Sequence, residues 1–176
     1  GASRSRAGLT TNPPGAGMSA DTYLKIQTRR AGAVKGESTA PGHADEILLS
    51  GWSWGANASS AIGAGASTAR RSYRNLTVTK AIDCASTALL SALATNDEVK
   101  EARLMMRKAG EGQQDFYSIT LKGARVAGIE LESDAEGSTQ ERVTFTFTKV
   151  EVEYRAQQGS GSRGAAFTFT DELIPT

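Results

Sequence analysis

The sequence contains a single cysteine and a single histidine, which excludes several kinds of site. Cys84 has no partner for an internal disulfide, and a zinc site would need several Cys or His ligands. His43 lies in a glycine- and proline-bearing stretch, and no serine sits in the strand–turn–helix pattern typical of a hydrolase nucleophile. The sequence therefore predicts no metal, no cofactor and no catalytic residue, and we expect that the protein is not an enzyme.

Long apolar runs and an excess of one charge are also missing. No stretch approaches the length needed to cross a bilayer, so we expect no membrane insertion. Residues 1–17 are rich in Gly, Ala, Ser and Pro and contain no apolar segment typical of a signal peptide. We interpret residues 1–17 as a disordered extension or expression tag, and residues 18–176 as a single domain. Without Arg4 and Arg6 the charge of that domain is close to zero, which gives no reason to expect nucleic-acid binding.

Helical patterning is nearly absent as well. Only one segment has apolar residues at helical spacing, with Leu89, Leu90 and Leu93 on one side. Ser86 is the expected N-cap of this helix, and the segment should end near Thr95 and Asn96. The sequence therefore predicts one helix of about three turns that covers a sheet or a barrel opening.

Alternating apolar and polar residues predict strands in most of the remaining chain. The expected strands cover residues 20–27, 46–55, 75–82, 98–108, 115–122, 125–132, 142–155 and 165–173. Residues 28–45 and 56–72 are expected to be long loops, residues 109–112 a hairpin turn, and residues 133–139 a polar loop. We predict an all-β fold, mainly β with one helix: a β-barrel of two antiparallel sheets flanked by one α-helix.

Two strands carry more specific expectations. In residues 142–155 the apolar positions change from odd numbers, ending at Phe147, to even numbers, starting at Val150. A regular strand cannot bury both sets, so we predict a bulge or sharp bend near Thr148 and Lys149. In the last strand, the alternation places Phe167 and Phe169 inside the fold.

Aromatic residues make up only 6% of the chain, yet both tryptophans fall in one block, Trp52-Ser53-Trp54. On an extended chain Trp52 and Trp54 point to the same side and Ser53 to the other. We interpret the two indoles as core anchors, and the alternative is that they stack on a ligand. Small polar residues facing outward on several strands are typical of a surface suited to solvent or to side-by-side assembly.

Several short blocks together resemble the Hcp (haemolysin-coregulated protein) family, which builds the inner tube of the type VI secretion system and is related in fold to phage tail tube proteins. The matching blocks are Tyr23–Ile26, Lys35–Ser38, His43–Ile47, Trp52–Gly55, Thr79–Asp83, Arg107–Gly110 and Val150–Tyr154. The resemblance implies an Hcp-like β-barrel over residues 18–176 that forms stacked hexameric rings. It also implies a lumen that carries small effector proteins, and export from the bacterial cytoplasm without a signal peptide.

The resemblance also implies partners and contact positions. The expected partners are further copies of the chain, the spike, sheath and baseplate proteins of the secretion system, and small effector proteins. Ser53 is the candidate lumen and cargo contact. The candidate ring-stacking loop is represented by Lys35, Gly36, Glu37, Ser38 and His43. The alternatives are a monomeric ligand-binding β-barrel and a phage-type tail tube protein.

Overall fold

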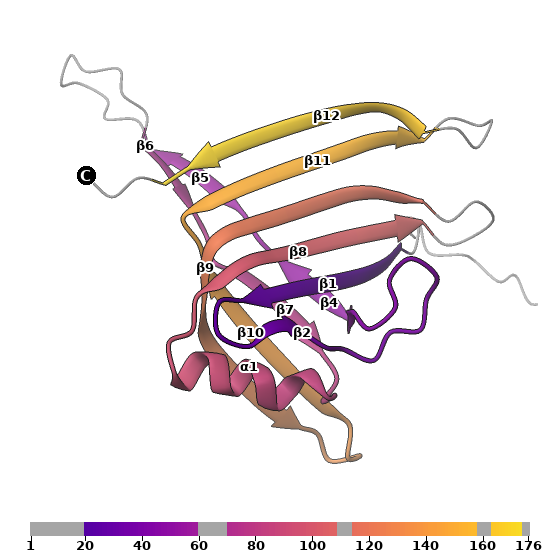
Figure 1. The fold of residues 1–176 in the computed structure, drawn as a ribbon, viewed down its shortest axis with the longest axis vertical. Coiled ribbons are helices and arrows are strands. Elements are labelled where there is room, and N and C mark those ends of the chain that lie inside the picture. The colour runs from indigo at the N-terminus through magenta and orange to yellow at the C-terminus, as the bar shows by residue number, and fades with distance from the viewer. Residues whose placement is uncertain (1–19, 60–69, 109–113, 158–162, 174–176) are drawn as a thin grey trace, which may run out of the picture.

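The computed structural model describes residues 20–59, 70–108, 114–157 and 163–173, and these form strands around one helix (Figure 1). The predicted extension at residues 1–17 and the predicted turn at 109–112 lie outside the described residues. In chain order the elements are β1 (Ala20–Thr28), β2 (Gly32–Val34), β3 (Ile47–Leu49), β4 (Gly51–Ser53), β5 (Ala56–Ser59), β6 (Arg70–Tyr73), β7 (Leu76–Lys80), α1 (Ala85–Ala94), β8 (Val99–Lys108), β9 (Asp115–Ser133), β10 (Thr139–Thr146), β11 (Lys149–Gln157) and β12 (Arg163–Glu172).

Apart from β5 and β6, which pair only with each other, the strands form two antiparallel sheets that share β9. Sheet A runs β12-β11-β9-β8-β1, with β2 and β3 both on the free side of β1. Sheet B runs β9-β10-β7-β4. The predicted mainly-β class with two sheets and one helix is confirmed. The described strands do not close into a complete barrel, because consecutive strands β3 and β4 pair with β1 and β7 respectively and not with each other.

Gly123 and Thr148 form the corner at which the chain passes from one sheet to the other. The first part of β9 pairs with β11, and its second part pairs with β10. Gly123 has a φ of 54°, and a Cβ at this position would lie 2.2 Å from the Thr148 hydroxyl oxygen. Because β10 ends at Thr146 and β11 begins at Lys149 in the other sheet, the bend predicted near Thr148 and Lys149 is confirmed. The two strands predicted at 115–122 and 125–132 are one bent strand, because a left-handed glycine turns the chain without ending it.

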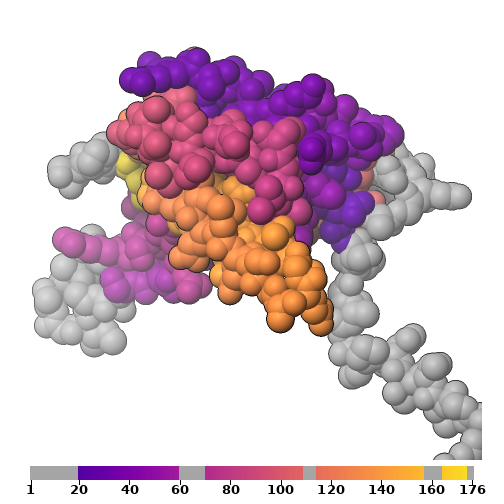
Figure 2. Space-filling view, turned by 90° about the horizontal axis from the view of Figure 1, so that it is seen from below, coloured from indigo at the N-terminus to yellow at the C-terminus, as the bar shows by residue number. Residues whose placement is uncertain are grey.

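The space between the sheets is filled by apolar side chains from both. Fully buried residues of sheet A include Leu24, Leu104 and Ile119, and Val78 and Phe145 come from sheet B. Helix α1 packs on β9 and β2, and Figure 2 shows it at the surface beside the β9–β10 hairpin. The alternation predicted for residues 20–27 and 98–108 gives the core positions correctly. For residues 75–82 it does so as far as Lys80, whereas Ile82 is 53% exposed.

The helix begins differently from the expectation. Its N-cap is Cys84, and Ser86 lies inside the first turn. The Ser86 hydroxyl donates to the Glu141 carboxylate at 2.6 Å and accepts from the Lys80 ammonium at 3.1 Å. Asp83 accepts the backbone N–H of Ala85 at 2.9 Å. The Ser86 hydroxyl therefore hydrogen-bonds to the buried Lys80–Glu141 pair. The local sequence does not reveal this role.

Two predicted loops contain strands, and a second predicted strand is divided, besides the one at 142–155 that becomes β10 and β11. Residues 28–45 include β2, which returns beside β1 after a turn ending at Gly32, where φ is 72°. Residues 56–72 include β5 and β6, which pair with each other, while 60–69 lie outside the described residues. The strand predicted at 46–55 is split at Ser50, whose N–H donates to Thr79 O at 2.8 Å. At that residue the chain leaves sheet A for sheet B.

The prediction that Phe167 and Phe169 point into the core is wrong. Their exposed fractions are 63% and 50%. They lie on β12, which pairs only with β11 and forms an edge of sheet A. Alternation identifies which side chains share a face, but it does not reveal whether the subunit covers that face.

Candidate functional site

Residues 35–46 form a compact loop held by its own backbone hydrogen bonds. The N–H of Gly36 donates to Asp45 O at 2.7 Å, and the N–H of Ser38 donates to Glu46 O at 3.0 Å. A Cβ on Gly36 would lie 2.3 Å from Glu46 O, so glycine is required for this close approach. The loop therefore has one defined conformation.

His43 fastens this loop to sheet A. Its side chain is 2% exposed and stacks on Tyr23 of β1, with ring centroids 4.2 Å apart and planes 5° apart. Nδ1 lies 2.6 Å from Glu46 Oε2, and Nε2 lies 2.7 Å from Asp115 Oδ1. Both ring nitrogens thus face carboxylates, so the ring is held at both sides. Burial raises the pKa of Tyr23 beneath it.

Arg107 of β8 completes the cluster around His43. Its guanidinium carbon lies 5.6 Å from the centre of the Tyr23 ring, and Nη2 donates to Pro41 O at 2.6 Å. Nε lies 3.6 Å from Asp115 Oδ1. The loop is therefore tied to β1, β8 and β9 together. The sequence gives His43 as a loop residue, but Asp115 is 72 positions away and its role could not be predicted.

The residues of the predicted ring-stacking loop separate into two groups. Gly36, Ser38 and His43 are buried within the subunit, whereas Lys35 and Glu37 are exposed. Contact with a second ring stays a prediction. Lys35 and Glu37 are the two members of the set whose side chains reach the surface.

Trp52 and Trp54 are partly buried and pack against the core. Trp52 stacks with Tyr117 at a centroid distance of 6.4 Å, and Trp54 is nearly parallel to Tyr73 at 5.7 Å. Phe147 lies 6.4 Å from Trp54. This aromatic group fills the end of the core near the corner of the two sheets.

Ser53 is exposed on β4, as expected for the residue facing away from the two indoles. It pairs with Thr77 of β7, and Thr77 pairs in turn with Thr144 of β10. The hydroxyls of Thr77 and Thr144 are 3.5 Å apart. Ser53 thus lies in a row of small polar residues on the outer face of sheet B.

An ion pair joins the base of the β5–β6 hairpin to β12. Arg71 pairs with Asp171 through Nε, and Arg71 Nη2 donates to Asp171 Oδ1 at 3.0 Å. The Tyr73 hydroxyl donates to the same carboxylate at 2.5 Å. The Arg71 and Tyr73 hydrogen bonds lower the pKa of Asp171 to about 2. No local signal could have paired residues 100 positions apart.

Sheet A has two edges without a partner strand among the described residues. On one side β12 carries Phe167 and Phe169, next to Tyr154 of β11, which is 44% exposed. On the other side β2 and β3 follow β1, and Leu48 of β3 is 55% exposed. Exposed apolar residues on open strand edges are typical of surfaces that pair with another chain.

Among the described residues, α1 is the only helix, and its ten residues are too few to cross a membrane.

Comparison with known proteins identifies the family of this β-rich chain. The family model for the type VI secretion system effector Hcp matches residues 23–154. Protein hcp1 of Pseudomonas aeruginosa is 35% identical over 150 residues, which cover 83% of this chain and 90% of that protein.

Solved structures agree with this match. The crystal structure of Hcp1 from Salmonella typhimurium is 28% identical, with a TM-score of 0.71, and the alignment covers 89% of this chain and 96% of that one. The structure of a type six secretion system protein is 26% identical, with a TM-score of 0.77, over 88% of this chain and 96% of that one. The chain therefore belongs to the Hcp family of type VI secretion system proteins.

Proposed function

We propose that the protein is a structural subunit of the inner tube of the type VI secretion system, where it forms hexameric rings that stack and are secreted. The observation that carries this proposal is the pair of open edges of sheet A. A closed ring requires two different patches on each subunit, because each interface joins one patch to the other. The β12 edge with Phe167 and Phe169 is one patch, and the β2–β3 edge with Leu48 is the other.

The remaining surfaces have roles consistent with such a tube. Lys35 and Glu37, on the loop fastened by His43, contact the next ring in the stack. The polar row that contains Ser53 faces the lumen and contacts small effector proteins carried there. The protein acts through interfaces with copies of itself and with the spike, sheath and baseplate proteins. Its role is structural and involves no catalysis.

The two alternatives have less support. A ligand-binding barrel needs an apolar cavity, but five of the best-formed hollows among the described residues are partly open to solvent, and each of these is lined by charged residues. The interior positions are filled by buried side chains such as Leu104 and Phe145. A phage-type tail tube protein would share the assembly, but the family match is to Hcp.

The ring is tested by measuring the mass of the purified protein in solution, together with negative-stain images. We expect a mass near six subunits and a ring with a central hole. Replacing Phe167 and Phe169 together by Glu should give monomers, because charges cannot be buried in an apolar interface without partners. Leu90→Glu is the matched control, since Leu90 is 52% exposed on α1 and lies on none of the edge strands β2, β3 and β12. A monomeric wild type at high concentration would contradict the proposal.

The lumen assignment has its own test. Ser53→Trp adds bulk at an exposed position, so rings should form normally while retention of an effector protein falls. The measurement is co-purification of an effector from the same secretion system with the assembled rings. Ser91→Trp, the same change at an exposed position on α1, is the control. Unchanged retention by the Ser53 variant would show that this face does not contact cargo.

A further inference from the structure

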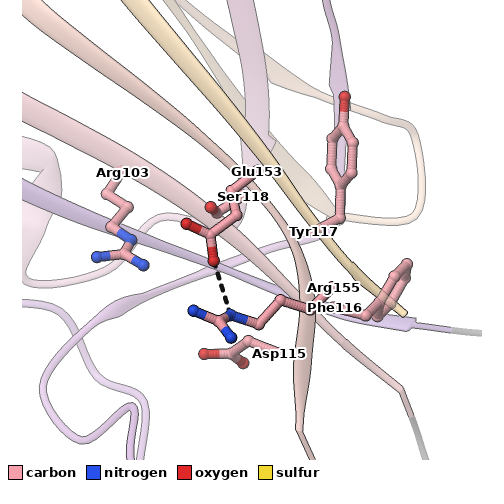
Figure 3. A pocket seen from close by; sticks show the side chains of 7 residues that line it. All are labelled: Arg103, Asp115, Phe116, Tyr117, Ser118, Glu153 and Arg155. Atoms are coloured by element: carbon pink, nitrogen blue, oxygen red, sulfur yellow. Dashed lines mark hydrogen bonds and ion pairs between the residues drawn. The ribbon is translucent and has the colours of Figure 1, made fainter. Parts of the chain in front are cut away.

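A polar pocket lies on the outer face of sheet A at one end of β9 and β11 (Figure 3). Its volume is about 160 Å³, and its walls come from β8, β9 and β11. Glu153 and Arg155 form one wall, where Arg155 Nε donates to Glu153 Oε1 at 2.8 Å. Ser118 lies on the floor between that pair and Arg103 on the opposite wall. The pocket is therefore lined by charged and hydroxyl groups.

Arg103 is the cation of this pocket that has no acidic partner within the described part of the chain. Arg155 is paired with Glu153, and Asp115 on the same rim is shared by His43 and Arg107. Arg103 is exposed, and Lys25 of β1 lies directly beside it in the strand register. In Figure 3 the Arg155 guanidinium lies below the Glu153 carboxylate, and that of Arg103 lies to its left, without a dashed line. The pocket thus has room and unneutralised positive charge for one more carboxylate.

The complementary group lies at the turn between β9 and β10. Glu130, Glu132, Asp134 and Glu136 are all exposed there. Asp134 accepts the backbone N–H groups of Glu136 and Ser138, both at 2.9 Å, which fixes the shape of the turn. Among the described residues, no cation lies within ion-pair distance of Glu132 or Glu136. The β9–β10 turn therefore has a defined shape, and its exposed side chains carry a net negative charge.

These two charged regions cannot meet within one subunit. Ser118 and Glu132 belong to the same strand, and β9 is held along both parts of its length by neighbouring strands. Figure 1 shows the β9–β10 turn below α1, while the start of β9 and the end of β11, which carry most of the pocket residues, lie at the right-hand side. We propose that the acidic β9–β10 turn of one subunit binds the Arg103 pocket of a second copy of this chain.

This inference rests on the proposed assembly and adds a second, electrostatic contact to it. The turn and the pocket are different patches, so the contact is of the kind that forms a ring or a stack. Asp115 lines the pocket and also holds His43, which places the pocket next to the loop at 35–46. The pocket is therefore adjacent to the part of the loop that carries His43.

The test is a charge exchange in the full chain, read as the protein concentration at half-assembly in mass photometry or sedimentation. Arg103→Glu and Glu132→Arg should each raise this concentration by about tenfold or more, because each places like charges together. The double variant should recover most of the loss. Lys100→Glu, with the same change in charge at an exposed position of the same strand, should have little effect. Arg103→Gln, which is milder for folding, should show a smaller loss in the same direction.

The outcomes separate the two proposals. If the wild type assembles and both single reversals assemble equally well, the contact is wrong and the tube function stands. Intact assembly with lost effector binding in Arg103→Glu would also overturn the contact, because the pocket would then serve the cargo. A wild type that stays monomeric at every concentration would overturn both. Additive losses in the double variant, with no recovery, would show that the two residues do not meet.

Discussion

The imidazole of His43 lies parallel to the phenol ring of Tyr23, with 4.2 Å between their centres, although twenty residues separate them in the chain. This stack brings the loop at 35–46 onto the outer face of β1. The two carboxylates at the ring nitrogens then fix the position of the imidazole within its own plane. The His43 side chain, together with the backbone hydrogen bonds of the loop, thus positions the segment that carries Lys35 and Glu37.

Replacing His43 by Phe should detach the loop while leaving the sheets folded. The stack on Tyr23 can survive, but Glu46 and Asp115 lose their donor, which costs about 1 to 3 kcal/mol. We expect a lower free energy of unfolding in urea and faster proteolytic cleavage within 35–46. Glu37→Gln is the control, because this exposed residue should change stability by less than about 0.5 kcal/mol. Equal cleavage rates in the two variants would contradict the role of His43.

Gly123→Ala should destabilise the corner between the sheets. The left-handed conformation costs an alanine about 1 to 2 kcal/mol, and the contact with Thr148 adds about 1 to 3 kcal/mol. Gly137→Ala is the matched control, because Gly137 has a φ of 84° but nothing within 4 Å of its added Cβ. Thermal and urea unfolding should therefore give a larger loss at Gly123. Equal losses would mean that the contact with Thr148 is unimportant.

Lys80→Met should be among the most damaging single substitutions in the core. The Lys80 side chain is fully buried, with Nζ 2.6 Å from Glu141 Oε2 and 2.8 Å from Asp83 Oδ1. Removing the ammonium leaves Glu141 buried without its cation, which costs about 3 to 5 kcal/mol. The double variant Lys80→Met, Glu141→Leu should recover part of that loss in urea unfolding. A double variant less stable than Lys80→Met alone would argue against this explanation.

The attachment of the β5–β6 hairpin to β12 should depend on pH in the acidic range. The pKa of Asp171 is lowered to about 2 from an ordinary value of 3.8. Its stabilising effect is therefore complete above about pH 4 and is lost as the pH falls through about 2. Proton NMR of Tyr73 should report the release between these values. Asp171→Asn should weaken the attachment at neutral pH and remove its pH dependence, and an unchanged transition in this variant would identify another carboxylate.

Local patterning predicts most of the strands, because alternation along β1, β7 and β8 reflects burial of one face within the subunit. The same reasoning locates the bend near Thr148. It fails at β12, where Phe167 and Phe169 share a face that the subunit leaves open. It also misses β2 and the β5–β6 hairpin, whose short strands are stabilised by turns and pairing and not by an apolar face.

The candidate contact residues are only partly predictable for a related reason. His43, Lys35 and Glu37 belong to recognisable blocks, yet the sequence does not distinguish the buried histidine from its exposed neighbours. Arg103 and Asp171 belong to no motif that sequence reasoning selects. Asp171 matters because the folded chain brings Arg71 beside it, and Arg103 matters because strands distant in sequence form a pocket around it.

The shared strand β9 also determines when each sheet can be completed during synthesis. Its second part and β7 need β10, and its first part needs β11, which in turn pairs with β12. Sheet B therefore lacks a strand until residue 146 has been made, and sheet A until residue 172. Strands β1 to β8 are present much earlier and expose their apolar faces in the meantime. We expect folding of the subunit to be late and cooperative, as is typical of topologies dominated by distant pairings. A nascent chain that stops before β10 should therefore depend on chaperones.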